Sequence, residues 1–287
     1  MTTLPVAIPE TDIVLYTDST PNGQKVSIVL EELGLKYETK HVDISKNVQK
    51  EDWYLRINPN GKVPAIVDKT LLCVGQSQER RIFEGGAILL YLTQRYDPNH
   101  KLSYPQNSER YWEMVQWLIW MQSSLGPMQG QSNHFYRYAP EKIPYAIDRY
   151  QTETKRLYSV LEELAQPGRE GPWLVGNKCT IADLACFSWV NWAEWAGVDV
   201  KPFKLISDWL QRINQRPAVQ KGLNVPRPFE MKEKMKTKVG VSSLASPTPS
   251  HSVRAIEATV HTCGSTNALS VITGGRKRVC REVQSLG

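Results

Sequence analysis

Strand and helix signals alternate along the first third of the chain, and this order restricts the possible folds more than any other feature. Residues 12–17 (DIVLYT) form an apolar run rich in β-branched side chains, which predicts a strand. Residues 21–34 carry apolar side chains at helical spacing and end in Gly34, which predicts a helix. Residues 36–44 predict a second strand. A strand, a helix and a strand in this order predict a right-handed crossover between parallel strands.

Further strand signals follow the crossover unit. The runs VPAIVD (63–68) and RIF (81–83) predict two more strands, and EGGAILLYLTQRY (84–96) predicts a helix that starts with two glycines. The segment 69–81 between the two strands is predicted to be an enlarged hairpin loop. We therefore expect residues 12–97 to form one α/β domain on a small mixed sheet.

From residue 108 onward the apolar side chains recur at helical spacing instead. The first predicted helix covers residues 108–125 and is expected to pack its apolar positions against other helices. Those positions are Trp112, Val115, Leu118 and Ile119.

A capping box variant marks the start of the most apolar of the later helices. Thr180 is the predicted N-cap, and Asp183 follows at the third helical position. The further helices are predicted over residues 146–165, 180–197 and 203–217. We expect residues 108–230 to form an all-helical domain, joined to the first by the turn residues of 97–107.

The segment 237–287 differs in composition from the rest of the chain. It contains no Phe, Trp or Tyr, and residues 242–252 are rich in Ser and Pro. Such a segment cannot bury enough apolar area to offset the entropy cost of ordering it. We interpret it as a disordered or aberrantly translated tail, with a basic targeting patch at 276–278 as the alternative.

Composition excludes several classes of partner. The tail supplies six Lys or Arg and two Asp or Glu, and so most of the net charge of +6, which argues against a basic nucleic-acid-binding face. No apolar run reaches about 18 residues, and the first residues do not resemble a secretory signal, so we expect no membrane segment. Five cysteines without CxxC or zinc spacing favour a reducing, cytoplasmic location and no metal.

A proline interrupts the strand-like run after residue 62. Pro64 stands between Val63 and Ala65, although a proline inside a strand removes a hydrogen-bond donor from the ladder. Such a proline is typical of a sheet edge, a bulge or a turn. One interpretation is that the main chain at Val63 pairs with a ligand and not with the sheet.

Two predicted helix starts carry residues suited to a charged ligand. At TPNGQK (20–25), Thr20 and Asn22 can donate hydrogen bonds to a thiolate, which lowers the pKa of a thiol. At the second start, Glu84 can pair with an ammonium and the N–H of Gly85 with a carboxylate, as an α-amino acid head would require. The local chemistry alone favours a plain turn at the first site, and glycines at a helix start often serve packing only.

Four motifs in this order resemble the glutathione transferases over roughly residues 12–230. They are LYT…TPNGQKVSIVLEELGL, NPNGKVPAIVD, FEGGAILLYL and TIADLACFSWV. The Thr-Pro-Asn-Gly element is similar to that of fungal relatives of the yeast nitrogen-catabolite regulator and of bacterial Nu-class enzymes. The resemblance implies an α/β thioredoxin-like N-terminal domain plus an all-α C-terminal helical bundle, and a homodimer.

The resemblance also assigns roles to residues of the first domain. It implies a cis bond before Pro64, with Val63 exchanging main-chain hydrogen bonds with the cysteinyl part of glutathione. Glu84 would take the γ-glutamyl ammonium and Gly85 the γ-glutamyl carboxylate, with lower affinity than the serine of many relatives. At the sulfur it places Asn22 and Thr20, and at the glycyl carboxylate Gln49, Lys62 and Asn60.

The implied activity is that of a glutathione transferase, with glutathione as co-substrate and no metal. Its thiolate would attack a small-molecule electrophile, a disulfide or a peroxide, in detoxification or in fungal secondary metabolism. The electrophile pocket is expected to include Trp120, Phe135 and Tyr136, with Arg137 in reach, unless these are core or solvated residues.

Two other functions on the same fold stay open. One is a non-enzymatic regulator of a transcription factor, although residues 1–11 are too short and not Asn-rich for the regulator's extra region. The other is a dedicated biosynthetic glutathione transferase.

Overall fold

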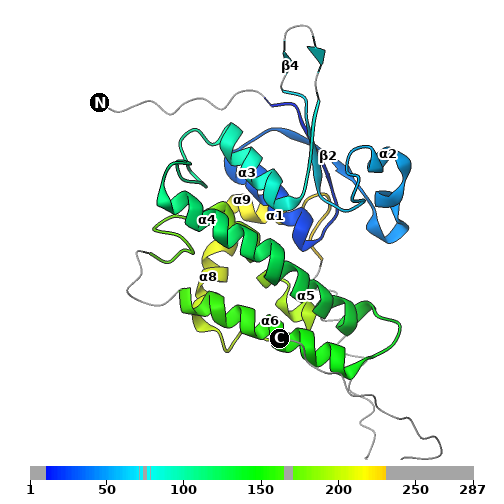
Figure 1. Ribbon diagram of the computed structural model, residues 1–287, viewed down its shortest axis with the longest axis vertical. Helices are drawn as coiled ribbons and strands as arrows, with labels where there is room; N and C mark the ends of the chain where they lie inside the picture. The colour runs from blue at the N-terminus through cyan, green and yellow to red at the C-terminus, as the bar shows by residue number, and fades with distance from the viewer. Residues whose placement is uncertain (1–10, 71, 74–75, 78, 165–170, 231–287) are drawn as a thin grey trace, which may run out of the picture. The chain divides into compact units, whose positions relative to one another are not determined.

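The computed structural model describes residues 11–230, apart from residue 71, residues 74–75, residue 78 and residues 165–170 (Figure 1). The described residues all belong to one compact unit of the chain. The tail predicted at 237–287 lies outside the described residues.

A four-stranded sheet with the order β2–β1–β3–β6 organises the first part of the chain. β1 pairs in parallel with β2 and antiparallel with β3, and β3 pairs antiparallel with β6. The parallel pair is joined by helix α1 (Pro21–Leu33), which confirms the predicted crossover. The strands are β1 (Ile13–Thr17), β2 (Tyr37–His41), β3 (Ala65–Asp68) and β6 (Arg80–Phe83).

Helices complete this thioredoxin-like domain, as predicted. α1 and α3 (Gly85–Tyr96) pack against each other, and α1 ends where Gly34 adopts a left-handed conformation. Between β2 and β3 the chain forms two 3₁₀ turns and the short helix α2 (Asp52–Leu55) (Figure 1). The predicted hairpin at 69–81 contains a second antiparallel pair, formed by β4 (Leu72–Cys73) and β5 (Gln76–Ser77).

The second part of the chain is helical, as predicted. Its central helix is α7, which is buried at every position because α1, α3, α4 and α8 all contact it. The helices are α4 (Glu109–Trp120), α5 (Gly126–Asn133), α6 (Pro144–Leu164), α7 (Ile181–Val190), α8 (Lys204–Asn214) and α9 (Pro217–Leu223).

The predicted core face of the first of these helices is partly wrong. Met114 and Leu118 are buried on α4, whereas Trp112 is 65% exposed and Ile119 is 51% exposed. Apolar side chains lie on more than one face of α4, and their spacing alone does not say which face meets α7.

The chain also stays helical beyond residue 125, where the prediction ended the helix. π turns at Met121–Leu125 and His134–Tyr138 flank α5, which contains Pro127 near its start. A proline cannot donate the helical hydrogen bond, and the π turn directly before it accommodates the break. Pro217 similarly begins α9, where the prediction used it only to end a helix.

Close packing of α1 on α9 joins the two parts of the chain. A Cβ atom on Gly222 would lie 2.5 Å from the Cα of Ile28, so only glycine permits this approach. Nearby, both carboxylate oxygens of Glu32 accept from Arg216, at 2.6 and 2.8 Å. Burial alone would raise the pKa of Glu32, but the hydrogen bonds and charges of Arg216 and Lys101 together outweigh it and hold the pKa below its ordinary value.

Asp183 connects three segments of the helical domain. Its buried carboxylate accepts from the N–H and hydroxyl of Thr180, completing the predicted cap, and also from the N–H of Leu174 and the indole of Trp209. One acidic side chain therefore satisfies four donors from different parts of the chain.

We predict that Asp183→Ala lowers the free energy of unfolding by about 3 kcal/mol or more, because it leaves several buried donors without a partner. Urea unfolding followed by circular dichroism measures this loss. The control is Asp208→Ala on the exposed side of α8, expected to change stability by less than about 0.5 kcal/mol. Equal effects of the two substitutions would contradict the role given to Asp183.

Candidate functional site

A cavity of about 410 Å³ lies where the starts of α1 and α3 and the segment before β3 meet α5 and α7. Seven of the nine site residues predicted from the sequence line it. They are Asn22, Asn60, Lys62, Val63, Pro64, Glu84 and Gly85. Thr20 and Gln49 are not among the lining residues.

The start of α1 presents free donors to the cavity. Pro21 has no N–H, and Thr20 caps the helix by accepting from the N–H of Gly23 at 3.0 Å. Neither the N–H nor the side-chain amide of Asn22 has a hydrogen-bond partner among the described residues. Thr20 thus acts as the N-cap, and Asn22 carries the donors that face the cavity.

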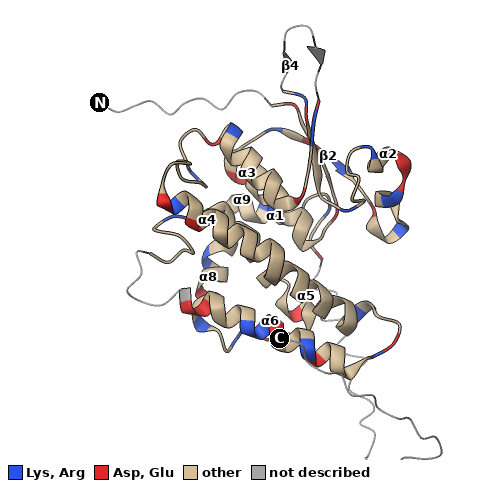
Figure 2. Ribbon diagram, in the orientation of Figure 1, with Lys and Arg blue, Asp and Glu red and all other residues tan. Residues whose placement is uncertain are grey.

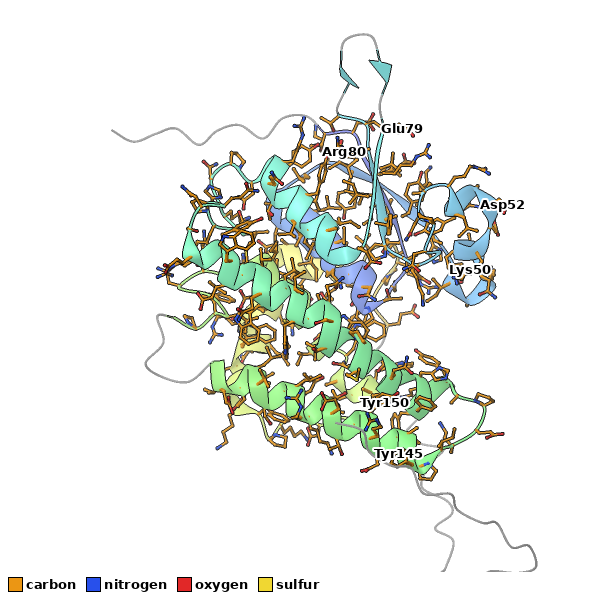
Figure 3. The ribbon with its side chains drawn as sticks, viewed as in Figure 1. Lys50, Asp52, Glu79, Arg80, Tyr145 and Tyr150 are labelled. Carbon is orange, nitrogen blue, oxygen red and sulfur yellow. The ribbon has the colours of Figure 1, made fainter. Side chains whose placement is uncertain are left out.

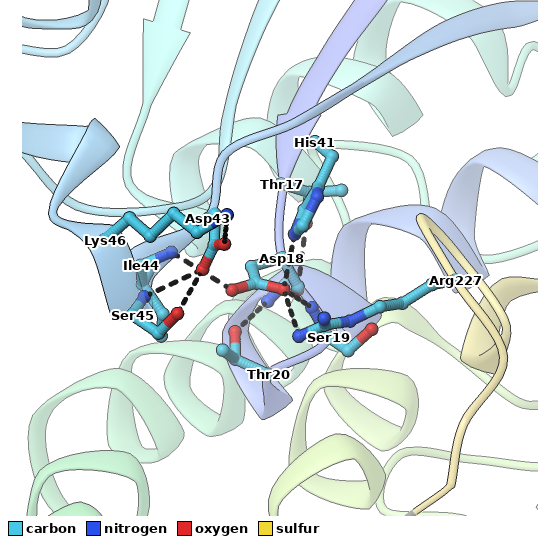
Figure 4. Close-up of polar contacts among 11 residues, drawn as sticks. Thr17, Asp18, Ser19, Thr20, His41, Asp43, Ile44, Ser45, Lys46 and Arg227 are labelled. Atoms are coloured by element: carbon cyan, nitrogen blue, oxygen red, sulfur yellow. Dashed lines mark hydrogen bonds and ion pairs between the residues drawn. The ribbon is translucent and has the colours of Figure 1, made fainter.

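The loop before α1 is held by Asp18, which the sequence analysis did not identify. Its buried carboxylate accepts from the N–H groups of Ser19 and Ile44 and lies 3.1 Å from the ring nitrogen of His41 (Figure 4). It also accepts from Arg227, at 3.2 Å, near the end of the described chain. A cluster drawn from four segments therefore fixes the position of Thr20 and Asn22.

The peptide bond between Val63 and Pro64 is cis, as the resemblance implied. Val63 lies outside β3, and the main chain just before it is held from both sides. The carbonyl of Lys62 accepts from the hydroxyl of Tyr54 at 2.7 Å and from the amide of Asn58 at 2.6 Å. Asn58 was missed, although the turn motif NPNG contains it and gave a usable signal.

The start of α3 is an uncapped helix end. Glu84 has φ of 68°, in the left-handed region that non-glycine residues rarely adopt, and no side chain caps the helix. The first helical bond comes from the N–H of Ile88, so the three N–H groups before it have no partner among the described residues. The exposed carboxylate of Glu84 accepts a 3.3 Å bond from the side-chain amide of Asn60. This end of the cavity offers an acidic side chain next to free N–H donors.

Gln49 lies close to the cavity without reaching it. Its main-chain oxygen is 3.0 Å from the position that a Cβ on Gly61 would take, and the Nζ of Lys50 is 2.9 Å from the same point. The buried side-chain oxygen of Gln49 has no hydrogen-bond partner among the described residues.

The residues predicted for the electrophile pocket lie elsewhere. Trp120 packs on Trp117, Phe135 stacks on Tyr150, and Arg137 donates to the carbonyl groups of Glu194 and Trp195. The cavity wall is formed instead by Gln122, Gly126, Pro127, Gly130, Gln131 and Trp189. Gly126, Pro127, Gly130 and Gln131 were missed because α5 was not predicted, and Gln122 and Trp189 lie on predicted helices whose cavity-facing side was not assigned.

This wall is uncharged. No Asp, Glu, Lys or Arg occurs between Glu113 and Arg137, and the ribbon of α5 is accordingly tan over most of its length (Figure 2). Gly126 and Gly130 face the indole of Trp189, whose N–H is buried and has no partner among the described residues. The wall thus offers a flat ring and amide groups to whatever fills the cavity.

Cysteine chemistry by the chain itself is not supported in the described residues. Cys179 and Cys186 are buried, and burial raises the pKa of both thiols well above the ordinary value. The described residues contain no cluster of His, Cys, Asp and Glu side chains that could hold a metal ion. No helix among them is long and apolar enough to cross a membrane.

Comparison with known protein families gives two matches along the chain. Residues 20–95 match the glutathione S-transferase N-terminal domain, and residues 131–217 match the glutathione S-transferase C-terminal domain. Each match lies inside one of the two domains predicted from the sequence.

The alignments with individual relatives span most of the length of each relative. The disulfide-bond oxidoreductase YfcG of Escherichia coli is 42% identical over 211 residues, which are 74% of this chain and 94% of that protein. The glutathione S-transferase-like protein gedE of Aspergillus terreus is 38% identical over 229 residues, 75% of this chain and 96% of that protein.

A solved structure has the same fold. The glutathione transferase homolog from Lodderomyces elongisporus, with two GSH per subunit, superimposes with a TM-score of 0.71 at 42% identity, over 75% of this chain and 99% of that one. The two family matches, the identity to the relatives and the shared fold agree, and the chain belongs to the glutathione S-transferase family.

Proposed function

We propose that this chain binds glutathione in the cavity and activates its thiol for attack on an electrophile or a disulfide. The observation that carries the proposal is the convergence of three features: the donors of Asn22, the main chain of Val63 and the carboxylate of Glu84. They match the thiol, the cysteinyl main chain and the γ-glutamyl ammonium of one extended tripeptide. Lys62 and Asn60 then serve the glycyl end, and Gln49 supports it from outside the cavity.

Activation follows from the donors at the start of α1. A thiolate near Asn22 would accept a hydrogen bond from the side-chain amide and from the free N–H, at the positive end of the helix dipole. These interactions stabilise the anion and not the thiol, so they lower the thiol pKa. Cys179 and Cys186 are buried and poorly suited to attack, and in our proposal the attacking sulfur comes from glutathione.

Two reactions suit a thiolate held in this way. In conjugation, a carbon–sulfur bond forms and the electrophile loses its leaving group or takes up a proton. In disulfide reduction, the thiolate attacks one sulfur, the other leaves as a thiolate, and a second glutathione resolves the mixed disulfide to oxidised glutathione. The relative named a disulfide-bond oxidoreductase, and the homolog with two GSH per subunit, favour the second reaction.

We predict that Asn22→Ala retains glutathione binding but raises the pKa of the bound thiol by about 1, because the thiolate loses a donor. Calorimetry measures the binding, and the ultraviolet absorbance of the thiolate measures the pKa. The matched control is Asn60→Ala at the other end of the cavity, which should weaken binding without changing the thiol pKa.

Two outcomes would contradict the role of Asn22 or the proposed enzymatic function. An unchanged thiol pKa in Asn22→Ala would contradict the role of Asn22. A wild-type protein that binds glutathione without lowering its thiol pKa would favour the regulator over an enzyme of detoxification or biosynthesis.

We predict that Glu84 selects the γ-glutamyl ammonium. Wild type should bind glutathione about tenfold or more tightly than an analogue without the γ-glutamyl amino group, since a charged hydrogen bond is lost. Glu84→Gln should abolish this preference. The control is Glu79→Gln, which changes an exposed glutamate (labelled in Figure 3) and should keep the preference. A preference that survives in Glu84→Gln would place the ammonium elsewhere.

We also propose that the chain forms a homodimer through α4. Trp112 and Ile119 are two helical turns apart on one side of α4, and both are largely exposed. A second copy would cover this apolar surface, and the related structure from Lodderomyces elongisporus is described by its subunits.

We predict that Trp112→Glu converts a dimer into a monomer, because it places a charge at the centre of the contact. Light scattering after gel filtration gives the mass. Tyr145→Glu is the control, because Tyr145 on α6 is 74% exposed and lies outside this surface (Figure 3). A wild-type monomer, or a dimer that tolerates Trp112→Glu, would rule out this interface.

A further inference from the structure

A lysine is completely buried on α1, next to the start of α3. Lys25 has no exposed surface, although buried lysines are rare unless they are paired. Its ammonium donates to the side-chain oxygen of Gln122 at 2.6 Å and lies 3.9 Å from the sulfur of Met121. No carboxylate lies within ion-pair distance of it among the described residues. The fold therefore buries this amine without a carboxylate in hydrogen-bond contact among the described residues, which is costly whenever the amine is charged.

The ammonium occupies the space that a side chain at residue 85 would need. A Cβ on Gly85 would lie 3.0 Å from the Cδ of Lys25 and 3.1 Å from its Nζ. The side chain of Lys25 is therefore in contact with the first residue of α3, whose N–H groups are uncapped.

The same lysine sets the orientation of Gln122. An ammonium has only donors, so the amide of Gln122 must turn its oxygen toward Lys25 and its NH₂ group away. Gln122 lines the cavity, and its nitrogen is 3.6 Å from the position of a Cβ on Gly86. An anion at the start of α3 would thus meet N–H donors, with the charge of Lys25 behind them.

We propose that Lys25 is the positioning cation for a carboxylate bound at the start of α3, acting through the amide of Gln122 and across the side-chain-free Gly85. The inference rests on the proposed function, which identifies this group as the α-carboxylate of the γ-glutamyl residue. The charge of Lys25 would stabilise the bound carboxylate in place of the hydrogen bond that a hydroxyl at residue 85 would donate.

The charge state of Lys25 makes the inference measurable. Burial lowers the pKa of Lys25 to about 7, while Cys186 on α7 and Glu84 before α3, the titratable groups acting on it, raise it in part. The Cys186 thiol is itself protonated near neutral pH, because burial raises its pKa. At pH 8 the free protein therefore holds Lys25 mostly neutral. A bound carboxylate favours the charged form, so binding takes up a proton, and affinity falls as pH rises above about 7.

The test is calorimetry with S-methylglutathione at pH 8, in phosphate and in Tris, whose different ionisation enthalpies reveal proton uptake. The methylated ligand has no thiol, so thiol ionisation does not contribute. Wild type should take up roughly half to one proton per ligand bound. Lys25→Met should bind about tenfold more weakly and lose this uptake.

Two further variants separate this role from a structural one. Lys62→Met removes the same charge from the exposed rim of the cavity, and should weaken binding while keeping the proton uptake. Gly85→Ala should reduce the uptake, because its methyl group displaces Lys25 without removing it. Lys25→Met itself should unfold thermally no earlier than wild type, since it replaces a buried amine with an apolar side chain of similar length.

Each outcome decides a different claim. If wild type binds without proton uptake, or Lys25→Met takes up as many protons as wild type, the inference about Lys25 is wrong and the glutathione site stands. If wild type fails to bind S-methylglutathione at all, the proposed function falls and this inference with it.

Discussion

Burial of α1 on all sides is the constraint on which the structure depends. The helix packs on α3 of the first part and on α7 and α9 of the second, so it belongs to both parts of the chain. Its first turn holds Asn22 at the cavity, and its last turn holds Glu32 against Arg216. Because one rigid helix carries both, the position of the sulfur site is tied to the docking of the helical domain.

The local features of the fold were predictable from the sequence, because they depend on neighbours along the chain. The crossover around α1, its stop at Gly34 and the cap of Thr180 with Asp183 follow from spacing and backbone preference. The exposed face of α4 was not predictable, since its choice depends on which side meets α7. The helix containing Pro127 was missed because its break is absorbed by a π turn that no local rule predicts.

The residues of the candidate site likewise fall into those that could be predicted from the sequence and those that could not. Asn22, Val63 and Glu84 stand at chain positions where a helix starts or a strand is interrupted, and such positions are visible in a sequence. Asp18 and Arg227 are 209 residues apart, and Lys25 and Gln122 are 97 apart, so only the folded chain brings each pair together. The supporting residues that are distant along the chain could therefore not be predicted from the sequence, whereas Asn58 lies in the turn motif NPNG and could have been.

Three unusual features of the described residues lie on the cavity or directly behind it. They are the completely buried Lys25, the indole N–H of Trp189 without a hydrogen-bond partner among the described residues, and the left-handed backbone of Glu84. Each of these costs stability in the protein without ligand. A zwitterionic ligand would pair Glu84 with its ammonium and give Lys25 a counter-charge. Binding of that ligand would therefore offset part of these costs, which couples affinity for it to the stability of the fold.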